Sequence, residues 1–455
     1  MTDRKIEYNS NFYEEKIKDS ILPGEFVESI SPKGTLYMVG GAVRDLINTG
    51  ELSEEVDFLL VGWHVNEVLW KLNTYGSAAY VGHSFGVIKF TYNGITSDIS
   101  VPEIRGSEST LKSDLENRDF TINSVAMRLP DMEIFDPFGG VKDIFAKVIR
   151  EDTALSLFQD PIRSLRGIRF SVQFGFQIEE KTMSHIKQST SMLDSVSPER
   201  IRDEVCKILV KIDKPSEALR MMQQMGIIRH IMPEVEKCIG VGQEGGWHIY
   251  DVFEHTLKAI DNAPKDLVLR LSLLFHDIGK PLCRYLDEET GRAHFTGHDN
   301  KSAELAKKRL KKLRFSNDII EDVLTIIGNH MTQIPETEKG KKRLIRRLGE
   351  ERIPLFIQHR IADLRAMDVE RVKKEIEANR VLGLQLREII DRKPPLQVKD
   401  LAIGGDELIE KFDIEQGPKI GEILDYLMDR VLEDIELNNR KKLLELSRDY
   451  IKNNL

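Results

Sequence analysis

The stretch that decides the fold is TLYMVGGAVRD, residues 35–45, with the triplet Glu55-Val56-Asp57 a short distance behind it. The apolar run Leu36–Val39 predicts a buried strand that two glycines end, and a helix and a second strand follow. Side chains two residues apart in a strand point the same way. We therefore expect the carboxylates of Glu55 and Asp57 to project together, near a glycine turn whose backbone amides can hold phosphate.

Two carboxylates beside a phosphate cradle make a site for Mg²⁺ and a nucleoside triphosphate. The alternative is a solvated acidic strand end behind the loop Ser53-Glu54-Glu55. This stretch alone leaves both interpretations open.

The bulk composition is that of a large, soluble, globular protein. The 455 residues suffice for several domains, and 40% are hydrophobic and 31% charged. The net charge of −9 argues against a generic nucleic-acid coat. Residues 307–314 and 341–347 are candidates for a local basic surface, although such a stretch is more often a solvated helix face.

The sequence also indicates a compartment. No run of about 18 apolar residues predicts a membrane span, and the polar N-terminus has no signal-peptide core. Cys206, Cys238 and Cys283 are widely spaced, which suits a reducing cytosol. We therefore expect a cytoplasmic protein that makes no membrane contact.

Patterning along the chain predicts an α+β protein in four parts. Residues 30–150 mix short β-rich runs with turns, which is typical of a small α/β domain. A connecting helical stretch covers 151–215, and a larger helical region with most of the histidines covers 216–385. Pro394-Pro395 marks a boundary, and residues 386–455 form a final helical segment.

Two later segments carry phosphate-binding chemistry. In Arg118–Asn123, Arg118 can pair with phosphate oxygens, while Asp119 and Asn123 can bind a ribose hydroxyl. The alternative is a helix start with Asp119 as its cap. The turn Asp136–Gly140 closes the α/β region.

The segment Gln159–Phe170 is richer. Arg163, Arg166 and Arg169 recur every three residues, so they are expected along one side of a helix, with Asp160 on the same side. Aligned guanidiniums could clamp a triphosphate. Asp160 and Arg163 could meet a base edge, because Asp accepts from an exocyclic amine and Arg donates to a ring nitrogen or carbonyl. A structural Asp–Arg pair is the alternative.

In this order the segments resemble the class II tRNA nucleotidyltransferase family, the CCA-adding enzymes and their bacterial poly(A) polymerase relatives. The resemblance covers nearly the whole chain, and the ordered set of motifs is highly specific. The matching segments are Leu36–Asp57, Arg118–Asn123, Asp136–Gly140, Asp160–Arg169, Ser197–Glu204, Leu401–Asp406 and Gly417–Gly421.

The resemblance implies a nucleotidyltransferase (polymerase-β-like) head, then an all-helical neck, body and tRNA-binding tail, arranged like a seahorse. It implies Mg²⁺ at the catalytic pair Glu55 and Asp57. The 3′-hydroxyl of tRNA would attack the α-phosphorus of CTP or ATP in line, and pyrophosphate would leave. Asp98, on a later strand-like run, could be a third carboxylate.

The resemblance also implies a nucleotide site. Asp160 and Arg163 would select C or A without a nucleic-acid template. The remaining nucleotide-binding residues would be Gly41, Arg44, Arg118, Asp119, Asn123, Arg166 and Arg169.

Three departures from the family pattern bear on specificity. Glu55 and Gln159 stand where the family commonly has Asp and Glu, and a misplacement of about 1 Å in a catalytic geometry can cost roughly 10²-fold. Between Arg105 and Arg118, the segment 106–117 is shorter than the flexible loop of full CCA-adding enzymes. Because a shortened loop is associated with enzymes that add only the two C residues, CC addition and CCA addition are equally expected.

The histidines of the helical body form a second constellation. His276–Pro281 is similar to the HD phosphohydrolase motif, with His255 as the upstream ligand and Asp363 as the downstream one. A lone histidine would be structural, but an ordered set favours a metal such as Ni²⁺, Mn²⁺ or Fe²⁺. The proposed ligands are His255, His276, Asp277 and Asp363, with His298 and His330 less strongly implied and His248 and His294 nearby. The expected activity is hydrolysis of 2′,3′-cyclic nucleotides or phosphate esters.

Two alternative functions remain at this point. One is a poly(A) polymerase of the same fold, which would extend any RNA with ATP alone. The other is an HD phosphohydrolase whose head has decayed into an RNA-binding module, an idea supported only by Glu55 and Gln159.

Overall fold

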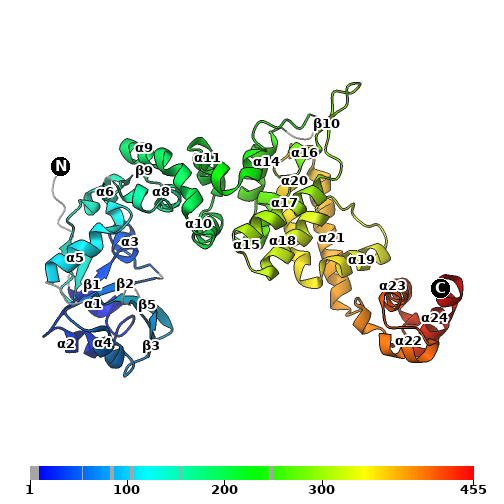
Figure 1. Ribbon diagram of the computed structural model, residues 1–455, viewed down its shortest axis with the longest axis horizontal. Helices are drawn as coiled ribbons and strands as arrows, with labels where there is room; N and C mark the ends of the chain where they lie inside the picture. The colour runs from blue at the N-terminus through cyan, green and yellow to red at the C-terminus, as the bar shows by residue number, and fades with distance from the viewer. Residues whose placement is uncertain are drawn as a thin grey trace. The chain divides into compact units, whose positions relative to one another are not determined.

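A computed structural model describes residues 10–53, 55–81, 87–102, 107–153, 155–244 and 249–454 (Figure 1). The chain divides into two compact units. The first comprises Met1–Ser197 and Met221–His230, and the second Pro198–Arg220 and Ile231–Leu455. The mixed α+β fold with a helical C-terminal region confirms the expected fold class.

A seven-stranded sheet organises the first unit, in the order β3-β4-β5-β2-β1-β6-β7. Neighbouring strands are antiparallel except for β2 and β5, which are parallel. The strands are β1 Thr35–Val39, β2 Asp57–Val61, β3 Ser77–Val81, β4 Val87–Tyr92, β5 Ile95–Ser100, β6 Ala126–Leu129 and β7 Ile134–Phe135.

Helix α5 (Ser107–Glu116) covers one face of this sheet. The register pairs Tyr37 with Leu59, and directly opposite residues of antiparallel strands point to the same face. Tyr37, Val39 and Leu59 pack in one buried cluster with Leu111 and Leu115 of α5. The apolar residues of β1 and β2 are buried on both faces, as the continuous apolar runs predict.

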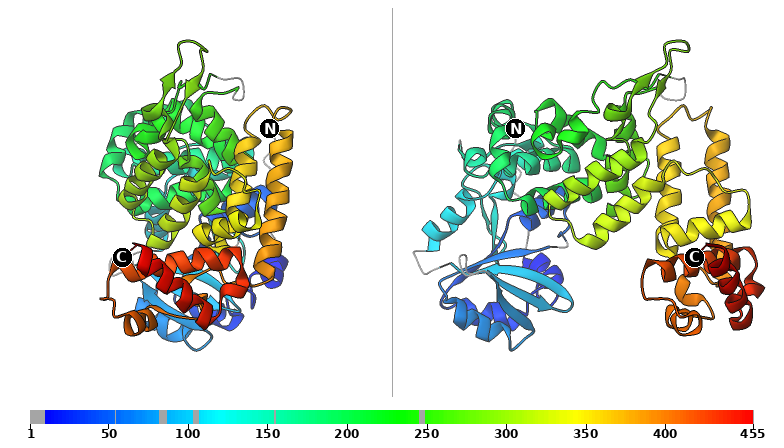
Figure 2. Two further views of the ribbon diagram at one scale, coloured as in Figure 1. Left: turned by 90° about the vertical axis from the view of Figure 1, so that its right-hand side faces the viewer. Right: turned by 45° about the vertical axis from the view of Figure 1, so that its right-hand side comes forward.

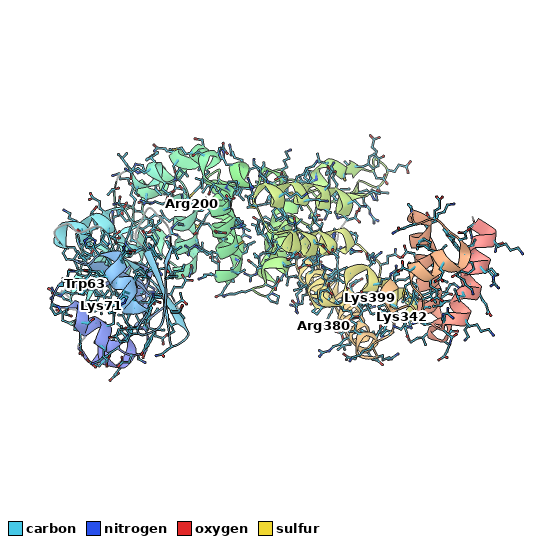
Figure 3. All side chains as sticks on the ribbon, turned by 60° about the horizontal axis from the view of Figure 1, so that its bottom comes forward. Trp63, Lys71, Arg200, Lys342, Arg380 and Lys399 are labelled. Atoms are coloured by element: carbon cyan, nitrogen blue, oxygen red, sulfur yellow. The ribbon has the colours of Figure 1, made fainter. Side chains whose placement is uncertain are left out.

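The remaining elements of the first unit surround the sheet or follow it. Trp63, on the loop after β2, donates through Nε1 to the Ile30 carbonyl at 3.1 Å, and Lys71 lies beside its ring (Figure 3). The two-residue strands β8 Val148–Ile149 and β9 Gln177–Ile178 pair in parallel. The helices are α1 Ser10–Lys16, α2 Gly24–Ile30, α3 Gly41–Thr49, α4 Val65–Leu72, η1 Thr121–Asn123, α6 Gly140–Ala146, α7 Ser156–Gln159, α8 Arg163–Phe174, α9 Glu180–Ser189 and η2 Thr190–Ser195.

The second unit is helical apart from a small hairpin of β10 (Tyr285–Leu286) and β11 (Ala293–His294), which projects from the helices (Figures 1 and 2). Its first helices are α10 Pro198–Lys211, α13 Pro233–Glu236, α14 Val252–Asp261, α15 Leu267–Phe275, α16 Lys280–Cys283, α17 His298–Lys312 and α18 Asn317–Asn329. Helices α11 Pro215–Gln224 and α12 Ile228–Ile231 lie where the chain passes between the units.

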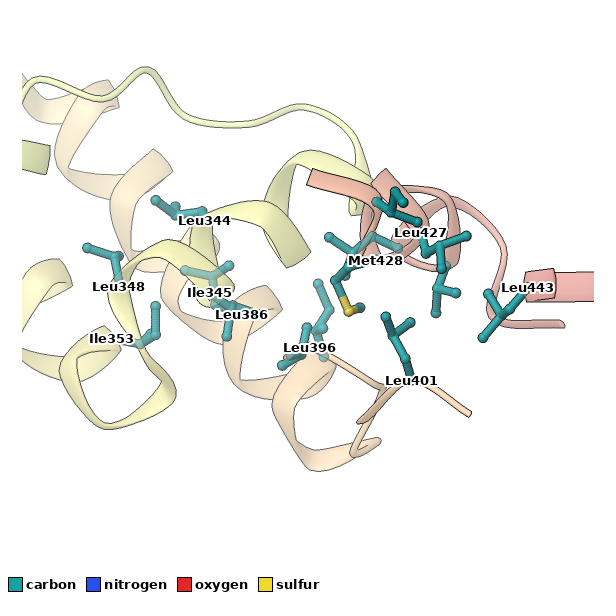
Figure 4. Close-up of a cluster of buried hydrophobic side chains, with 14 of the residues drawn as sticks. Leu344, Ile345, Leu348, Ile353, Leu386, Leu396, Leu401, Leu427, Met428 and Leu443 are labelled. Carbon is teal, nitrogen blue, oxygen red and sulfur yellow. The ribbon is translucent and has the colours of Figure 1, made fainter. Parts of the chain in front are cut away.

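The C-terminal helices continue the second unit (Figure 2). They are α19 Glu338–Leu348, η3 Glu350–Arg352, α20 Ile353–Leu364, α21 Lys373–Asp391, η4 Val398–Asp400, α22 Gly405–Phe412, α23 Pro418–Glu433, η5 Ile435–Leu437 and α24 Arg440–Asn454. A buried cluster joins α19, α20, α21, α23 and α24, with Leu386, Leu396 and Met428 in its middle (Figure 4).

Ion pairs line α19 and α23 beside this cluster. Lys339 pairs with Glu433, Arg343 with Asp429 and Arg346 with Asp425. Lys342 pairs with Glu338 on its own helix. The basic stretch 341–347 is therefore largely neutralised by acidic partners instead of forming an open basic surface.

Helix α21 runs through residue 385 without interruption, and the buried cluster extends past Pro394-Pro395. The division into four parts remains a prediction. No helix in the described part of the chain is long and apolar enough to cross a membrane.

Candidate functional site

The predicted metal pair lies where β2 begins. Asp57 is the first residue of β2 and stands opposite Val39, the last residue of β1 before the glycine turn. Glu55 and Asp57 are both exposed, and Val56 between them is buried. This alternation places the two carboxylates on the solvent side of the chain, as the period of two predicts.

Electrostatics show that the acids of this edge influence one another. Desolvation raises the pKa of Asp57 above its ordinary value; the Arg118 guanidinium opposes the rise, and the Asp98 and Glu55 carboxylates add to it. Asp98 stands directly opposite Asp57 on the neighbouring strand β5. A divalent cation bound beside Asp57 would stabilise its ionised carboxylate.

The glycine turn leaves room for Arg118. Gly40 has a φ of +71°, which favours glycine, and a Cβ there would lie 2.3 Å from Nη1 of Arg118. Arg118 also donates to a carboxylate oxygen of Asp114 on α5, from Nε at 3.1 Å and from Nη2 at 3.0 Å. Arg118 thus reaches the turn that precedes α3 while anchored to α5.

Arg44, on α3, is buried. Its Nη1 donates to Oδ1 of Asn123 at 2.6 Å and its Nε to Asp45 at 2.8 Å. Its guanidinium stacks over Phe174, 4.2 Å from the ring centroid. Arg44 therefore orders the second motif around Asn123.

Asp119 is the buried centre of the second motif. Its carboxylate accepts hydrogen bonds from Nε of Arg166 at 2.7 Å, from Nδ2 of Asn123 at 2.8 Å and from the Phe120 amide at 3.0 Å. Burial alone would raise the pKa of Asp119, but Arg166 and Asn123 hold it below its ordinary value. The 3₁₀ helix that follows has Phe120 at its N-cap position, so Asp119 is not the helix cap.

The arginine helix differs from the expectation in one respect. Helix α8 begins at Arg163, and Asp160 lies before it, directly after α7, with Pro161 and Ile162 between Asp160 and α8. Asp160 therefore shares no helix with the arginines, although its carboxylate is 3.9 Å from Nε of Arg163.

The three arginines also have separate partners. Arg163 donates to the Asn117 carbonyl at 2.6 Å, Arg166 binds Asp119, and Arg169 donates to Gln173 at 3.0 Å. Arg166 thus joins α8 to the second motif and Arg163 joins it to the residue before that motif, while Arg169 bonds within α8. Gln159, beside Asp160, is exposed.

The third motif is a helix start. The Asp136 carboxylate accepts from the amides of Gly140 at 2.7 Å and Val141 at 3.0 Å, at the beginning of α6. A Cβ at Gly140 would lie 2.0 Å from the Thr121 carbonyl oxygen. The motif thus packs α6 against the second motif.

In the second unit, the predicted histidine ligands converge in two groups. Ligand atoms of His255, His276 and Asp363 lie within 4.8 Å of one another, and so do those of Asp277, His298 and His330. The set comes from α14, the segments at the ends of α15 and α18, α17 and α20. All six residues implied by the sequence are therefore brought together, including His298 and His330.

The Nε2 and carboxylate atoms of these groups lie close together in the buried interior. Nε2 of His255 lies 2.7 Å from Asp363, and Nε2 of His298 lies 3.3 Å from Asp277. Among the described residues, Nε2 of His276 and both carboxylate oxygens of Asp277 are buried and make no hydrogen bond of normal geometry, although Nε2 of His276 lies within ion-pair distance of Oδ2 of Asp277, at 3.2 Å. Nδ1 atoms of His276, His298 and His330 face the backbone carbonyls of Leu273, Phe295 and Ile327 at 2.7–2.8 Å, which orients each Nε2 inward.

The buried carboxylates and imidazoles of this cluster shift one another's pKa values. Burial alone would lower the pKa of His276, but the carboxylates of Asp277 and Asp363 raise it to about 10. Burial and the neighbouring His276 lower the pKa of His330 to about 4. The cluster thus attracts one positive charge, as a cation site does.

The sequence did not indicate three neighbours of the cluster. Nζ of Lys280 lies 2.7 Å from Asp277 and donates to Gln243 at 2.6 Å. His359 is fully buried, and the centre of its ring lies 5.4 Å from that of His276. Lys280 stands in the quoted HD motif, which was a usable signal, but nothing marked Gln243. His294 is exposed outside both groups, and His248 lies outside the described residues.

An open cavity of about 480 Å³ adjoins the histidine cluster. It is lined by Lys280, Phe295, Thr296 and Asp299 together with ligands of both groups. Its size suits a mononucleotide or a smaller phosphate ester.

The fold and the head site define a nucleotidyltransferase. Family comparisons agree: residues 36–150 match the poly A polymerase head domain. Residues 175–239 match the "Probable RNA and SrmB- binding site of polymerase A", and residues 287–446 match tRNA nucleotidyltransferase domain 2.

Curated relatives identify the family. The chain is 30% identical over 406 residues to the CC-adding tRNA nucleotidyltransferase of Thermus thermophilus, covering 86% of this chain and 88% of that protein. It is 29% identical to the A-adding tRNA nucleotidyltransferase of Deinococcus radiodurans, covering 85% and 89%. The chain belongs to the class II tRNA nucleotidyltransferase family and is a nucleotidyltransferase enzyme.

Solved structures share the fold. The CCA-adding enzyme of Bacillus stearothermophilus in complex with CTP matches with a TM-score of 0.65 at 20% identity, covering 94% of this chain and 98% of that one. The Thermotoga maritima CCA-adding enzyme complexed with tRNA matches with a TM-score of 0.53 at 21% identity, covering 94% and 93%. Neither the poly(A) polymerase nor the decayed-head alternative is favoured.

The Asp119–Arg166 pair generates a stability prediction. Replacing Arg166 by Met removes the charged partner of the buried Asp119 carboxylate. We expect the free energy of unfolding to fall by about 2–4 kcal/mol at pH 6. The fall is smaller than for a fully buried pair because Arg166 is 33% exposed. Because the pKa of Asp119 is depressed in the fold, its contribution is present above the ordinary value of 3.8 and lost as the pH falls below it. The difference in the free energy of unfolding between wild type and Arg166→Met should therefore become smaller below about pH 4, as measured by thermal unfolding.

A matched control is Arg128→Met, which removes an exposed arginine that donates to Asp131 at 3.0 Å. This substitution should lower the free energy of unfolding by about 0–1 kcal/mol, both at pH 6 and below about pH 4. Equal losses for the two variants at pH 6 would contradict the role assigned to Asp119 and Arg166.

Proposed function

We propose that the protein adds C residues from CTP to the 3′ end of tRNA and stops after the second C. The observation that carries this proposal is the helix α5. It fills residues 107–116, where full CCA-adding enzymes have a longer flexible loop, and Asp114 ties it to Arg118. A regular helix anchored to the second motif lacks the length of chain that such a loop needs.

The relatives support the proposal and also define its main competitor. The Thermus thermophilus relative is named for CC addition, and the Deinococcus radiodurans relative for A addition, at nearly the same identity. The short segment before Arg118 favours CC addition.

Glu55 and Asp57 fit a divalent metal site for this reaction. Both offer exposed carboxylates at one sheet edge, and desolvation, with added effects of Asp98 and Glu55, raises the pKa of Asp57, which a bound cation would reverse. Mg²⁺ bound there would neutralise charge on the triphosphate and favour loss of the 3′-hydroxyl proton. Glu55 reaches one methylene further than the usual Asp.

The other residues have positioning roles in the proposal. Asp160 and Arg163 meet the base, with Asp160 accepting from the exocyclic amine of cytosine and Arg163 donating to its ring edge. Gly41, Arg44, Arg118, Asp119, Asn123, Arg166 and Arg169 surround the sugar and phosphates. The bond from the tRNA 3′-oxygen to the α-phosphorus forms, the bond between the α- and β-phosphates breaks, and pyrophosphate and a proton leave.

We keep the four-part division in the proposal. The head covers residues 30–150, the neck 151–215, the body 216–385 and the tRNA-binding tail 386–455. The CTP and tRNA complexes of structural relatives support CTP and a tRNA 3′ end as partners.

The proposal predicts the products of an addition assay. Purified protein is incubated with tRNA lacking CCA, with tRNA ending in C and with tRNA ending in CC, each with CTP, ATP or both. When CTP is present, we expect addition of two C residues, one C residue and no residue, respectively, because the segment 106–117 is shorter than the loop of full CCA-adding enzymes. Products are resolved at single-nucleotide resolution.

Efficient addition of A to tRNA ending in CC would contradict CC-only addition, and unlimited extension with ATP would identify a poly(A) polymerase. Glu55→Gln/Asp57→Asn serves as the control for contaminating activity. It should add no nucleotide to any of the three substrates.

We propose in addition that the histidine cluster binds one or two transition-metal ions and hydrolyses phosphate esters or 2′,3′-cyclic nucleotides. The two ligand groups, the buried atoms of His276 and Asp277 and the adjoining cavity support this second function. Imidazole and carboxylate ligands suit Ni²⁺, Mn²⁺ or Fe²⁺.

The second function predicts a loss of metal in a ligand variant. His276→Ala/Asp277→Ala removes one ligand from each group, so we expect bound metal and hydrolysis of 2′,3′-cyclic AMP or p-nitrophenyl phosphate both to disappear. Metal content is measured by mass spectrometry after loading with Mn²⁺, Ni²⁺ or Fe²⁺.

The control is His64→Ala, which removes an exposed histidine of the first unit, outside both ligand groups, and should retain metal and activity. Addition of C by the double variant shows that the chain is folded. If wild type and double variant bind equal amounts of every metal, the cluster is structural.

A further inference from the structure

A row of three charged side chains crosses the sheet beside the catalytic pair. In the register of β4, β5 and β2, Lys89 stands opposite Asp98, and Asp98 stands opposite Asp57. Residues directly opposite one another project from the same face of a sheet. The Lys89 side chain therefore projects from the same face of the sheet as Asp57.

Lys89 and Asp98 form a direct ion pair. Nζ of Lys89 donates to Oδ1 of Asp98 at 2.9 Å, and both side chains are about half exposed. An exposed pair of this kind is weak by itself. Here the negative surroundings strengthen it: the Asp98 bond is the first cause of a raised pKa for Lys89, and Asp57 and Glu55 add to it.

The ammonium group competes with a metal for the same carboxylate. Asp98 is positioned next to Asp57, where it would otherwise be a third acid for a divalent cation. The Asp98 carboxylate binds a metal ion less strongly when it already neutralises Lys89, and the Lys89 ammonium repels a cation placed between it and Asp57.

We infer that Lys89 is a positioning residue that holds Asp98 out of the metal site, so that Glu55 and Asp57 alone bind the divalent cations of the head. Asp98 is then not the third metal ligand that the sequence suggested. It rests on the proposed metal site at Glu55 and Asp57.

The test measures Mn²⁺ binding to the full-length protein by electron paramagnetic resonance. The head's share is the Mn²⁺ that Glu55→Gln/Asp57→Asn loses. For that share, we expect Lys89→Met to bind Mn²⁺ at least threefold more tightly, because Asp98 becomes available as a ligand. Lys89→Arg keeps the ion pair and should remain within twofold of wild type.

Two further variants show whether Asp98 is responsible. Lys89→Met/Asp98→Asn should return to within twofold of wild type, and Asp98→Asn alone should weaken binding by no more than twofold. If the double variant keeps the tighter binding, or if Asp98→Asn loses more than fivefold, the inference is wrong.

Arg118→Met separates coordination from general charge, since Arg118 is another cation that acts on Asp57. If this variant tightens Mn²⁺ binding as much as Lys89→Met, the effect is one of general charge and the inference fails. If Glu55→Gln/Asp57→Asn loses no Mn²⁺ at all, the proposed metal site fails instead, so the two failures are distinguishable.

Discussion

The register of β2 between β1 and β5 is the constraint on which the head site depends. It sets Asp57 opposite Val39, which leads into the glycine turn, and opposite Asp98 on the other side. A slip of one residue would turn Asp57 into the core and Phe58 out to solvent. The buried Phe58 and Leu60 on one face and Leu59 and Val61 on the other oppose that slip, so hydrophobic packing fixes the position of the proposed catalytic acids.

Three arginines of the head connect further elements around this site. Arg118 joins the glycine turn to α5, Arg44 joins α3 to Asn123, and Arg166 joins α8 to Asp119. Each guanidinium spans two elements that are distant in sequence. The proposed nucleotide site is thus preorganised by buried and partly buried polar contacts, which are strengthened by a low local dielectric. A bound triphosphate would exchange some of these partners for phosphate oxygens.

Sequence patterning predicted most of this structure because strand period, glycine turns and motif order are local signals. The runs at Leu36–Val39 and 56–61 became β1 and β2, and the histidines of the body converged as their order implied. Three features depended on tertiary contacts and were not predictable in this way. Asp160 lies outside the arginine helix, the partners of α8 were dictated by packing, and Lys89 entered the site through strand register with no motif to mark it.

The central claim is that Glu55 and Asp57 form the metal-binding edge of a CTP-dependent transferase. Anomalous diffraction from crystals grown with Mn²⁺ and a non-hydrolysable CTP analogue tests it most directly. The account predicts Mn²⁺ peaks at the carboxylates of both residues and against the triphosphate, with Asp98 still bound to Lys89. Mn²⁺ at the histidine cluster alone, or coordination by Asp98 in place of Glu55, would contradict it.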